Sequence, residues 1–312
     1  MKIKFKYVPA IAALLITFVF PSAQAFGAHS AAPTSSAVLV NGKLKTFDSY
    51  NINGYNYFKL RDIAYVLNGT AKQFGIDWMT TDGTITLRPG SLYVTLGDEM
   101  ASKATEAKTA SPSTRKVFVA GNVNQIPFEA YNIDGYNYFK LRDIGIVMDM
   151  GIGWDEARNT ISIDSTKGYV ESQPFTPLDK AVAEAILSRN KGFYGGGGDF
   201  FCQAHITLLT VQNGNNITDY VIAFYEELKK TGNVIVSAGG TFGPAAITFQ
   251  LNSAGNYKLT EYWTPDDGSR YNITIQDKFP KELWDKVGAQ FYVAALMSNT
   301  NAQARAHYDQ QL

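Results

Sequence analysis

Histidine and cysteine serve in many sites of nucleophilic catalysis and of metal binding, and this chain is poor in both. It has three histidines and one cysteine. His29, His205 and His307 stand far apart, without the clustered imidazole, thiolate and carboxylate spacing that holds copper or zinc. The sequence therefore predicts no metal site and no cofactor.

Cys202 lies three residues before His205, so a thiolate and its base have to be considered. Residues three apart on one strand point to opposite faces, which argues against such a pair. A lone cysteine allows no intramolecular disulfide, and we expect Cys202 to be buried as a small apolar residue. His205 alone is interpreted as structural, with catalysis as the alternative.

The glycine run at 195–198 could cradle a phosphate only where a strand leads into a helix and a Lys, Ser or Thr follows. Asp199 follows instead, and its carboxylate would repel a phosphate. We interpret the run as a flexible hinge.

The elements that position these residues are organised by an internal duplication. Tyr50–Ile63 recurs as Tyr131–Ile144, with only Asn53 against Asp134 different. Looser matches extend the copies to about 37–97 and 116–167, and the Ala-, Ser- and Thr-rich residues 100–116 predict a loose connection. The looser matches are Val38–Gly42 with Val117–Gly121, Gly75–Trp78 with Gly151–Trp154, and Thr84–Leu87 with Thr160–Ile163.

Each copy predicts a strand, a hairpin, a short helix, a tryptophan-bearing turn and a strand. Asn53-Gly54 and Asp134-Gly135 favour hairpin turns because these residues accept positive φ. One hairpin with one helix buries too little surface to stand alone, so we expect the copies to pair into one α+β module. The helix faces are predicted as Leu60, Ile63 and Leu67, and Leu141, Ile144 and Met148. The repeat positions that we expect to be structural are Gly54, Tyr57, Leu60, Arg61, Asp62, Trp78, Gly135, Tyr138, Leu141, Arg142, Asp143 and Trp154.

The paired arginines and tyrosines of the repeats suggest specific roles. We expect Arg61 and Arg142 each to hold a carboxylate or carbonyl at a helix start, because Arg suits bidentate anchoring. The tyrosines allow two interpretations: they fill half-buried pleats, which we favour, or they form an exposed row that stacks on cell-wall sugars. These tyrosines are Tyr55, Tyr57, Tyr136 and Tyr138.

The twin Tyr-Phe-Lys-Leu-Arg-Asp-Ile blocks, with the later Trp and Thr-Ile-Thr strand, resemble the copper amine oxidase N-terminal-like domain, or stalk domain, of exported Gram-positive proteins. The resemblance covers residues 37–167 and implies an accessory cell-surface or spacing module. Amine oxidation would need a tyrosine in an Asn-Tyr-Asp/Glu setting and three histidines around copper. Asn56-Tyr57 and Asn137-Tyr138 are each followed by phenylalanine, so we expect no amine oxidase activity.

The N-terminus has the order of a secretory signal: Lys2, Lys4 and Lys6, an apolar run over 7–20, and Ala23-Gln24-Ala25. We expect cleavage after Ala25, a disordered linker over 26–36, and a mature chain that is secreted or held at the outer face of the envelope. Loss of three lysines leaves 25 basic against 28 acidic residues, a net charge of −3. We therefore expect no nucleic-acid partner, and we find no later stretch that could span a membrane.

Residues 168–312 predict a second α+β domain with an antiparallel sheet and flanking helices. Thr176-Pro177-Leu178-Asp179 predicts a helix start, with a Thr cap, Pro at the first helical position and an acid at the third. Strands are expected over 204–211, 234–237, 246–251, 257–263 and 272–275. A last helix is expected over 280–297, with Leu283, Val287, Phe291 and Ala294 on one stripe and a polar tail after it.

This half resembles an extracytoplasmic module that accompanies BlaR/MecR-type membrane sensors, in Gln203-Ala204-His205, Pro265-Asp266-Asp267-Gly268 and Lys278-Phe279-Pro280 among other segments. That module has Glu-Gly-His where this chain has Gln203-Ala204-His205, and the sensors' zinc motif is missing, so peptidase activity does not carry over.

Two function classes remain. The first is an exported, non-catalytic envelope or secreted protein, with a stalk-like module and a binding or interaction domain whose partner is a cell-wall or other envelope component. The alternative is an enzyme or enzyme regulator with a hydrolase-type site around His205, Glu261 and Asp266. The two classes separate on whether these three side chains meet in one cleft.

Overall fold

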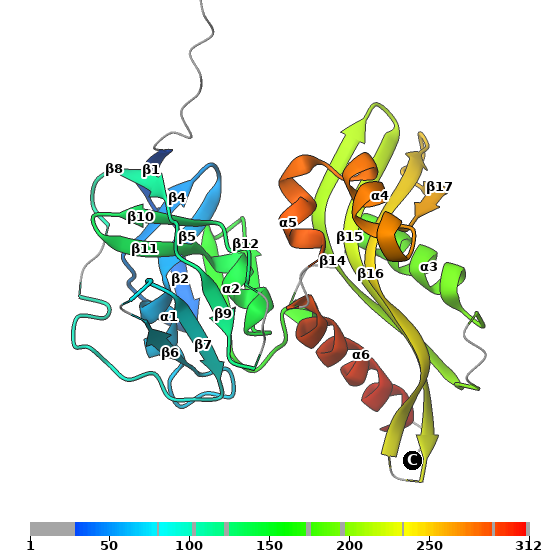
Figure 1. Cartoon of the computed structure of the whole chain (residues 1–312), viewed down its shortest axis with the longest axis horizontal. Coiled ribbons are helices and arrows are strands. Elements are labelled where there is room, and N and C mark those ends of the chain that lie inside the picture. The colour runs from blue at the N-terminus through cyan, green and yellow to red at the C-terminus, as the bar shows by residue number, and fades with distance from the viewer. Residues whose placement is uncertain are drawn as a thin grey trace, which may run out of the picture.

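The computed structural model describes residues 29–79, 81–101, 104–121, 125–172, 176–193, 197–232, 234–288 and 291–309, so the predicted signal at 1–25 lies outside it. Antiparallel sheets and helices give the α+β fold that the sequence predicts. Figure 1 shows a duplicated module beside a sheet domain. In the module the elements are β1 (His29–Pro33), β2 (Ala37–Val40), β3 (Lys43–Lys45), β4 (Ser49–Ile52), β5 (Tyr55–Lys59), α1 (Leu60–Leu67), β6 (Phe74–Trp78), β7 (Ile85–Pro89), β8 (Lys108–Pro112), β9 (Val117–Val119), β10 (Ala130–Ile133), β11 (Tyr136–Lys140), α2 (Leu141–Val147), β12 (Gly151–Asp155), β13 (Thr160–Asp164) and η1 (Val170–Ser172). The sheet domain has α3 (Pro177–Asn190), β14 (Phe200–Asn213), β15 (Asn216–Thr231), β16 (Val234–Leu251), β17 (Tyr257–Trp263), η2 (Gly268–Arg270), α4 (Tyr271–Lys278), η3 (Lys281–Leu283), α5 (Trp284–Val287) and α6 (Tyr292–Asp309).

Each copy contains the predicted hairpin, because its turn residues accept a left-handed backbone. Asn53 and Gly54 have φ of 52° and 84°, and Asp134 and Gly135 have φ of 50° and 86°. The helices that follow bury the predicted faces, which are Leu60, Ile63 and Leu67 in the first copy and Leu141, Ile144 and Met148 in the second.

The two copies are joined by a reciprocal exchange of strands. β5 pairs with β11, and the matched residues Phe58 and Phe139 lie opposite each other, which places a pseudo-two-fold axis between the copies. β2 of the first copy pairs with β13 of the second, and β9 of the second pairs with β7 of the first. Each copy therefore completes a sheet of the other, and one core holds side chains from both.

β1, β4, β5, β11, β10 and β8 close into a barrel. Tyr57 and Tyr138 are buried inside it, as the pleat-filling interpretation predicts. Tyr55 and Tyr136, next to the hairpin turns, are exposed, so that interpretation is wrong for them.

Strands β1 and β8 correct two predictions. The sequence predicts a disordered linker over 26–36 and a loose connection over 100–116, but His29–Pro33 and Lys108–Pro112 are strands. They pair with each other and with the barrel hairpins. Main-chain hydrogen bonds between distant segments order them, and residue composition does not reveal such bonds.

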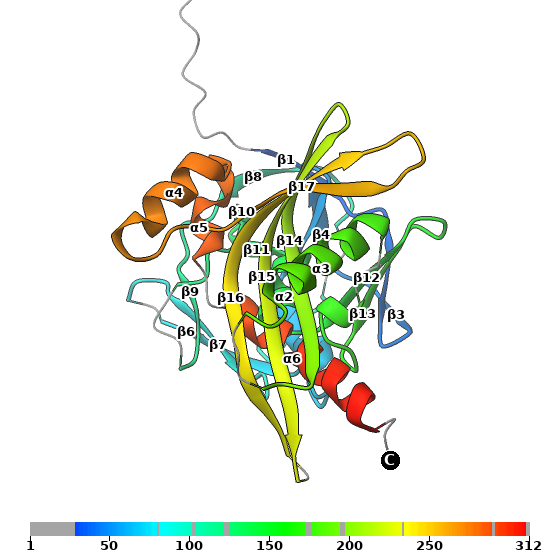
Figure 2. The same cartoon turned by 90° about the vertical axis from the view of Figure 1, so that its right-hand side faces the viewer.

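The sheet domain is one antiparallel sheet in the order β14, β15, β16, β17. α3 covers one face, and α4, α5 and α6 lie on the other face, toward the module (Figures 1 and 2). Val182 and Ile186 of α3 pack on Val221 of β15. On the module side, Ala204 of β14 packs with Leu296 of α6.

Several local predictions for this domain are wrong. The predicted strand at 272–275 lies within α4, which buries Ile275 in the core although Ile273 and Thr274 favour strands. The predicted helix at 280–297 is instead η3, α5 and α6, with α5 ending at Val287 and Gly288 as its C-cap. Ala294 is exposed. His307 lies in α6 and not in a polar tail.

Candidate functional site

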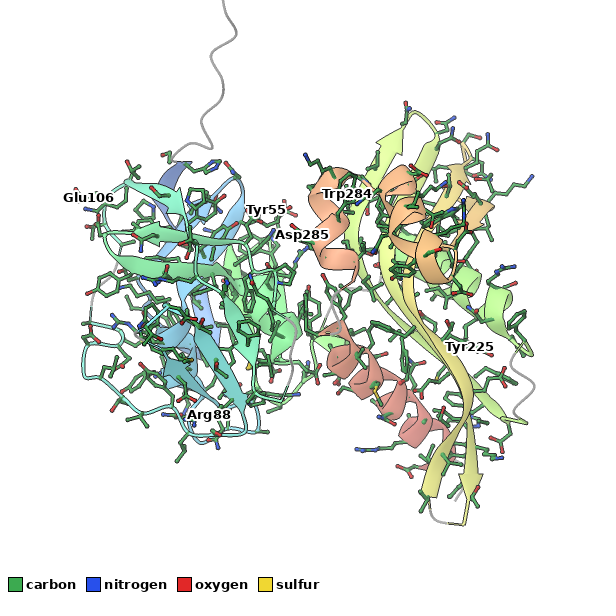
Figure 3. All side chains as sticks on the ribbon, in the orientation of Figure 1. Tyr55, Arg88, Glu106, Tyr225, Trp284 and Asp285 are labelled. Atoms are coloured by element: carbon green, nitrogen blue, oxygen red, sulfur yellow. The ribbon has the colours of Figure 1, made fainter. Side chains whose placement is uncertain are left out.

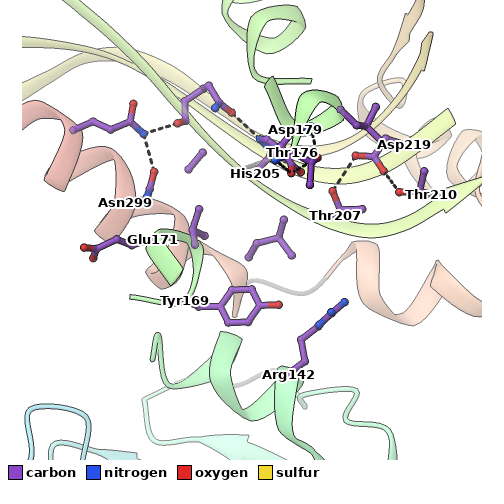
Figure 4. A pocket seen from close by; sticks show the side chains of 16 residues that line it. Arg142, Tyr169, Glu171, Thr176, Asp179, His205, Thr207, Thr210, Asp219 and Asn299 are labelled. Carbon is purple, nitrogen blue, oxygen red and sulfur yellow. Dashed lines mark hydrogen bonds and ion pairs between the residues drawn. The ribbon is translucent and has the colours of Figure 1, made fainter. Parts of the chain in front are cut away.

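A pocket of about 660 Å³ lies where β14, the edge strand of the sheet, meets the module. Ile146 and Tyr169 of the module share an apolar cluster with Ala204, Ile206 and Tyr292 of the sheet domain, and this cluster holds the junction together. Figure 4 shows side chains from both parts around the pocket. α2 and η1 form one wall, and the start of α3, β14 and α6 form the others.

His205 lines this pocket from β14, with its side chain almost fully buried. Its Nδ1 lies 3.0 Å from Gln203 Oε1, and its Nε2 lies 3.7 Å from Asp179 Oδ1. A general base has to direct a ring nitrogen at its substrate. Because both nitrogens of His205 face oxygens of the protein, the ring ties α3 to β14 and is not placed for proton abstraction.

Asp179 belongs to the capping box that the sequence predicts at the start of α3. Its backbone N–H donates to Thr176 Oγ1 over 3.1 Å, and its Oδ2 accepts from the Thr176 N–H over 2.8 Å. Burial raises the pKa of Asp179, but hydrogen bonds from His205 and Thr176 outweigh burial and leave the pKa below its usual range. The carboxylate is therefore charged and internally satisfied at neutral pH.

Asp219 lies on β15 behind the edge strand and is fully buried. It accepts hydrogen bonds from Thr207 Oγ1 at 2.9 Å and Thr210 Oγ1 at 2.6 Å, while burial raises its pKa. The threonine hydroxyls of the pocket, with Thr176 included, all donate to carboxylates. None of them is therefore placed as a nucleophile for His205.

Arg142 lines the pocket from α2 and is exposed. Within the part of the chain that the structure describes, no carboxylate lies within 4 Å of its guanidinium. Its counterpart Arg61 binds Asp98 at 3.0 Å, as we predicted for a carboxylate partner. The repeat continues to Tyr93-Val94 and Tyr169-Val170, which aligns Asp98 with Pro174. The carboxylate that we predicted as one of two possible partners for Arg142 is therefore not found among the described residues, and the position that matches Asp98 has no carboxylate.

Glu261 and Asp266 do not join His205. Glu261 lies on β17, at the opposite edge of the sheet from β14, and binds Lys278 Nζ at 2.7 Å. Asp266 binds Arg270 Nε at 2.7 Å. The predicted cleft of His205, Glu261 and Asp266 is therefore not formed, since the strand order separates its members.

Cys202 is buried on the face of β14 opposite His205, as the sequence predicts. It packs with Leu228 and Tyr308, and burial raises the pKa of its thiol to about 12. The thiol is therefore protonated and shielded at neutral pH.

The remaining sequence candidates have other surroundings. His29 packs edge-on against Tyr131 in the barrel, and His307 stacks on Phe200. Gly197 and Gly198 lead into β14, whereas Gly195 and Gly196 lie outside the described residues. Across the described ranges, no three His, Cys, Asp or Glu side chains are placed to hold a metal ion. No described helix combines the length and apolar character needed to cross a bilayer.

Side-chain amides line the pocket in place of a catalytic pair. Gln303 Nε2 of α6 donates to the Gln203 carbonyl and to Asn299 Oδ1, each over 2.7 Å. The sequence analysis did not identify Asn299, Gln303 or the exposed Arg142 as pocket residues. The one signal in the sequence was Pro174, which stands in the second copy where the first copy has Asp98.

Comparison with protein-family models, curated proteins and solved structures found no match.

Proposed function

We propose that this chain is an exported, non-catalytic binding protein of the cell envelope, whose junction pocket holds a carboxylate-bearing ligand. The observation that carries the proposal is the exposed guanidinium of Arg142 at the wall of a 660 Å³ pocket, without a carboxylate partner among the described residues. A pocket of this size suits a small ligand. Arg binds carboxylates through two parallel hydrogen bonds, which sets orientation as well as affinity.

The other lining side chains indicate a peptide-like ligand. Asn299, Gln303 and Gln203 present amide groups, and exposed Glu171 presents a carboxylate to an amine. A short peptide with a free carboxylate combines these groups, and cell-wall peptides carry the same chemistry. The resemblance of residues 37–167 to the stalk domain and the signal-like order of 1–25 support a location at the envelope.

The arrangement of polar groups favours binding over hydrolysis. The nitrogens of His205 face Gln203 and Asp179, and the nearby threonine hydroxyls donate to carboxylates. No nucleophile and base therefore face a common point in the pocket.

Fractionation of cells that produce the chain tests the location, and sedimentation of the purified mature chain with isolated cell walls tests the contact. We expect the protein outside the cytosol and in the wall pellet. Recovery in the cytosol alone would overturn export, and free protein without wall affinity would overturn the envelope partner. Copper addition should produce no quinone absorbance, and its appearance would overturn the non-catalytic assignment.

A further inference from the structure

The junction pocket runs along the outer edge of β14 and not over one face of the sheet. Consecutive residues of that strand, 203–207, all line it, although neighbouring side chains on a strand point to opposite faces. Asp179 of α3 lines the pocket from one face of the sheet, and Asn299 of α6 lines it from the other. The pocket therefore gives access to the outer main chain of the edge strand.

The accessible edge is regular over a short stretch only. β14 pairs with β15 on one side, and no described strand pairs with its other side. At the start of this free edge, the Gln203 carbonyl already accepts a hydrogen bond from Gln303 Nε2. After Thr207 the register shifts before Leu209, and such a bulge interrupts regular pairing. We call residues 204–207 the open stretch.

The open stretch lacks the features that usually keep other strands away from an edge. Edge strands are commonly protected by lysine, proline or inward-pointing charges. β17, at the opposite edge of the sheet, carries exposed Lys258 and Glu261, whereas the open stretch has no lysine, proline or carboxylate. It lies instead within a pocket of about 660 Å³, which admits a small ligand but not the sheet of another protein.

The start of α2 lies beside the second half of β14. Lys140, the residue before α2, lines a neighbouring junction cleft together with residues 208–209 of β14. Figure 3 shows Tyr55 of the module and Asp285 of α5, which line the same cleft, close to each other at this junction. Arg142 is the second residue of α2, so its guanidinium belongs to this end of the junction pocket.

The two ends of the junction pocket therefore differ in charge. Figure 4 shows Arg142 on the side of Thr207 and Thr210, and Asn299 on the opposite side. A peptide whose terminal carboxylate binds Arg142 ends beyond the open stretch, near the second half of β14. The main chain before that carboxylate then follows the open stretch from the side of α6, in the same direction as β14.

We propose that the ligand of the junction pocket is a peptide that adds to β14 as a short parallel strand, with its C-terminal carboxylate at Arg142. Strand addition rests on the proposed function, because it presupposes the contact between the carboxylate and Arg142. In this mode of recognition, main-chain hydrogen bonds supply the affinity. Only alternate residues of an added strand direct their N–H and C=O groups toward the neighbouring strand.

Two isomers of a methylated peptide test strand addition by isothermal titration calorimetry with the mature chain. The parent, acetyl-tetra-alanine, offers a main chain and a free carboxylate without functional side chains, and its length matches the open stretch. One isomer is N-methylated at its first and third residues, and the other at its second and fourth. One of them loses the N–H groups that face β14, so it should bind about tenfold or more weakly than the parent, while the other binds like the parent. Because the two isomers have the same composition, each is the control for the other.

Hydrogen exchange followed by mass spectrometry locates the contact. Acetyl-tetra-alanine should slow exchange in the segment that contains 204–207 and leave the other edge strand, Tyr257–Trp263, unchanged. Equal affinity of the two isomers, no binding of the parent peptide, or unchanged exchange over the open stretch would overturn strand addition.

The C-terminal carboxamide of acetyl-tetra-alanine tests the proposed function separately. A carboxamide that binds more weakly than the parent, together with isomers that bind alike, would leave the contact to Arg142 standing and remove strand addition. A carboxamide that binds like the parent would instead overturn the contact to Arg142, and with it the direction assigned to the peptide.

Discussion

Replacing Asp48 by asparagine removes the partner of a buried ammonium group. Lys59 Nζ lies 2.5 Å from Asp48 Oδ2, and the two side chains are 8% and 12% exposed. The hydroxyl of Tyr138 also donates to Asp48 Oδ2, over 2.8 Å. Breaking a buried ion pair by removing one partner costs about 3–5 kcal/mol. Because asparagine keeps one acceptor oxygen, we expect a loss near the lower end, about 3 kcal/mol.

The second copy supplies a matched control. Lys140 Nζ lies 3.4 Å from Glu129 Oε2, and the Glu129 side chain is 37% exposed. Solvent screens this longer pair, so Glu129→Gln should cost about 1 kcal/mol or less. The Lys140 side chain, 9% exposed, is as buried as that of Lys59, so the comparison keeps the buried lysine and changes the burial of its acid partner.

Urea unfolding of the mature chain, followed by far-ultraviolet circular dichroism and by tryptophan fluorescence, measures both losses. Coincident transitions by the two probes are required before free energies are compared. Equal losses for Asp48→Asn and Glu129→Gln would refute the reasoning from burial. Asp48→Asn combined with Lys59→Met should recover part of the loss, since no unpaired buried charge remains.

Three further outcomes follow from single side chains. Cys202 should react slowly with a maleimide in the native state and quickly in urea, whereas fast native labelling or a covalent dimer on a non-reducing gel would contradict its burial. Arg61→Lys should lower the melting temperature by weakening the bond to Asp98, whereas Arg142→Lys should leave it unchanged, and equal effects would contradict the assigned difference. Burial raises the pKa of Glu99, but hydrogen bonds from backbone N–H groups and the Tyr93 hydroxyl outweigh it and lower the pKa to about 2. Glu99 therefore stabilises the fold above its ordinary pKa of 4.5 and loses this effect as the pH falls toward about 2, so Glu99→Gln should flatten the melting temperature over that range.

Local features of the fold could be predicted from the sequence because neighbouring residues determine them. The hairpin turn at Asn53-Gly54 depends on two adjacent backbones, and the capping box of Thr176 and Asp179 depends on residues three apart. The buried stripes of α1 and α2 follow from helical spacing. These features needed no knowledge of the rest of the chain.

Features that depend on pairing between distant segments were missed. The exchange of β2 and β9 between the copies has no local signature, nor does the ordering of β1 by β4 and β8. β15 was not predicted, because its central position makes Tyr220–Phe224 a continuous apolar run without alternation.

The candidate site was only partly predictable for the same reason. His205 does line a pocket, but of its sequence-based partners Glu261 lies on the far edge strand β17 and Asp266 follows that strand. The arginine that distinguishes the pocket, Arg142, looked equivalent to Arg61 because the repeats match there. The two arginines differ in their partners: Pro174 stands where the first copy has Asp98, and both positions lie outside the aligned copies 37–97 and 116–167.

The central claim, that the junction pocket binds a carboxylate of the cell wall through Arg142, is tested most directly by sedimentation with isolated walls. Wild type, Arg142→Gln and the charge-matched control Arg158→Gln are compared, since the Arg158 side chain is 82% exposed and lies outside the pocket. A charged hydrogen bond contributes about 1.5–3 kcal/mol, so Arg142→Gln should weaken retention by about 10- to 150-fold. Arg158→Gln should bind like the wild type. Equal retention of all three proteins, or no retention of the wild type, would contradict the claim.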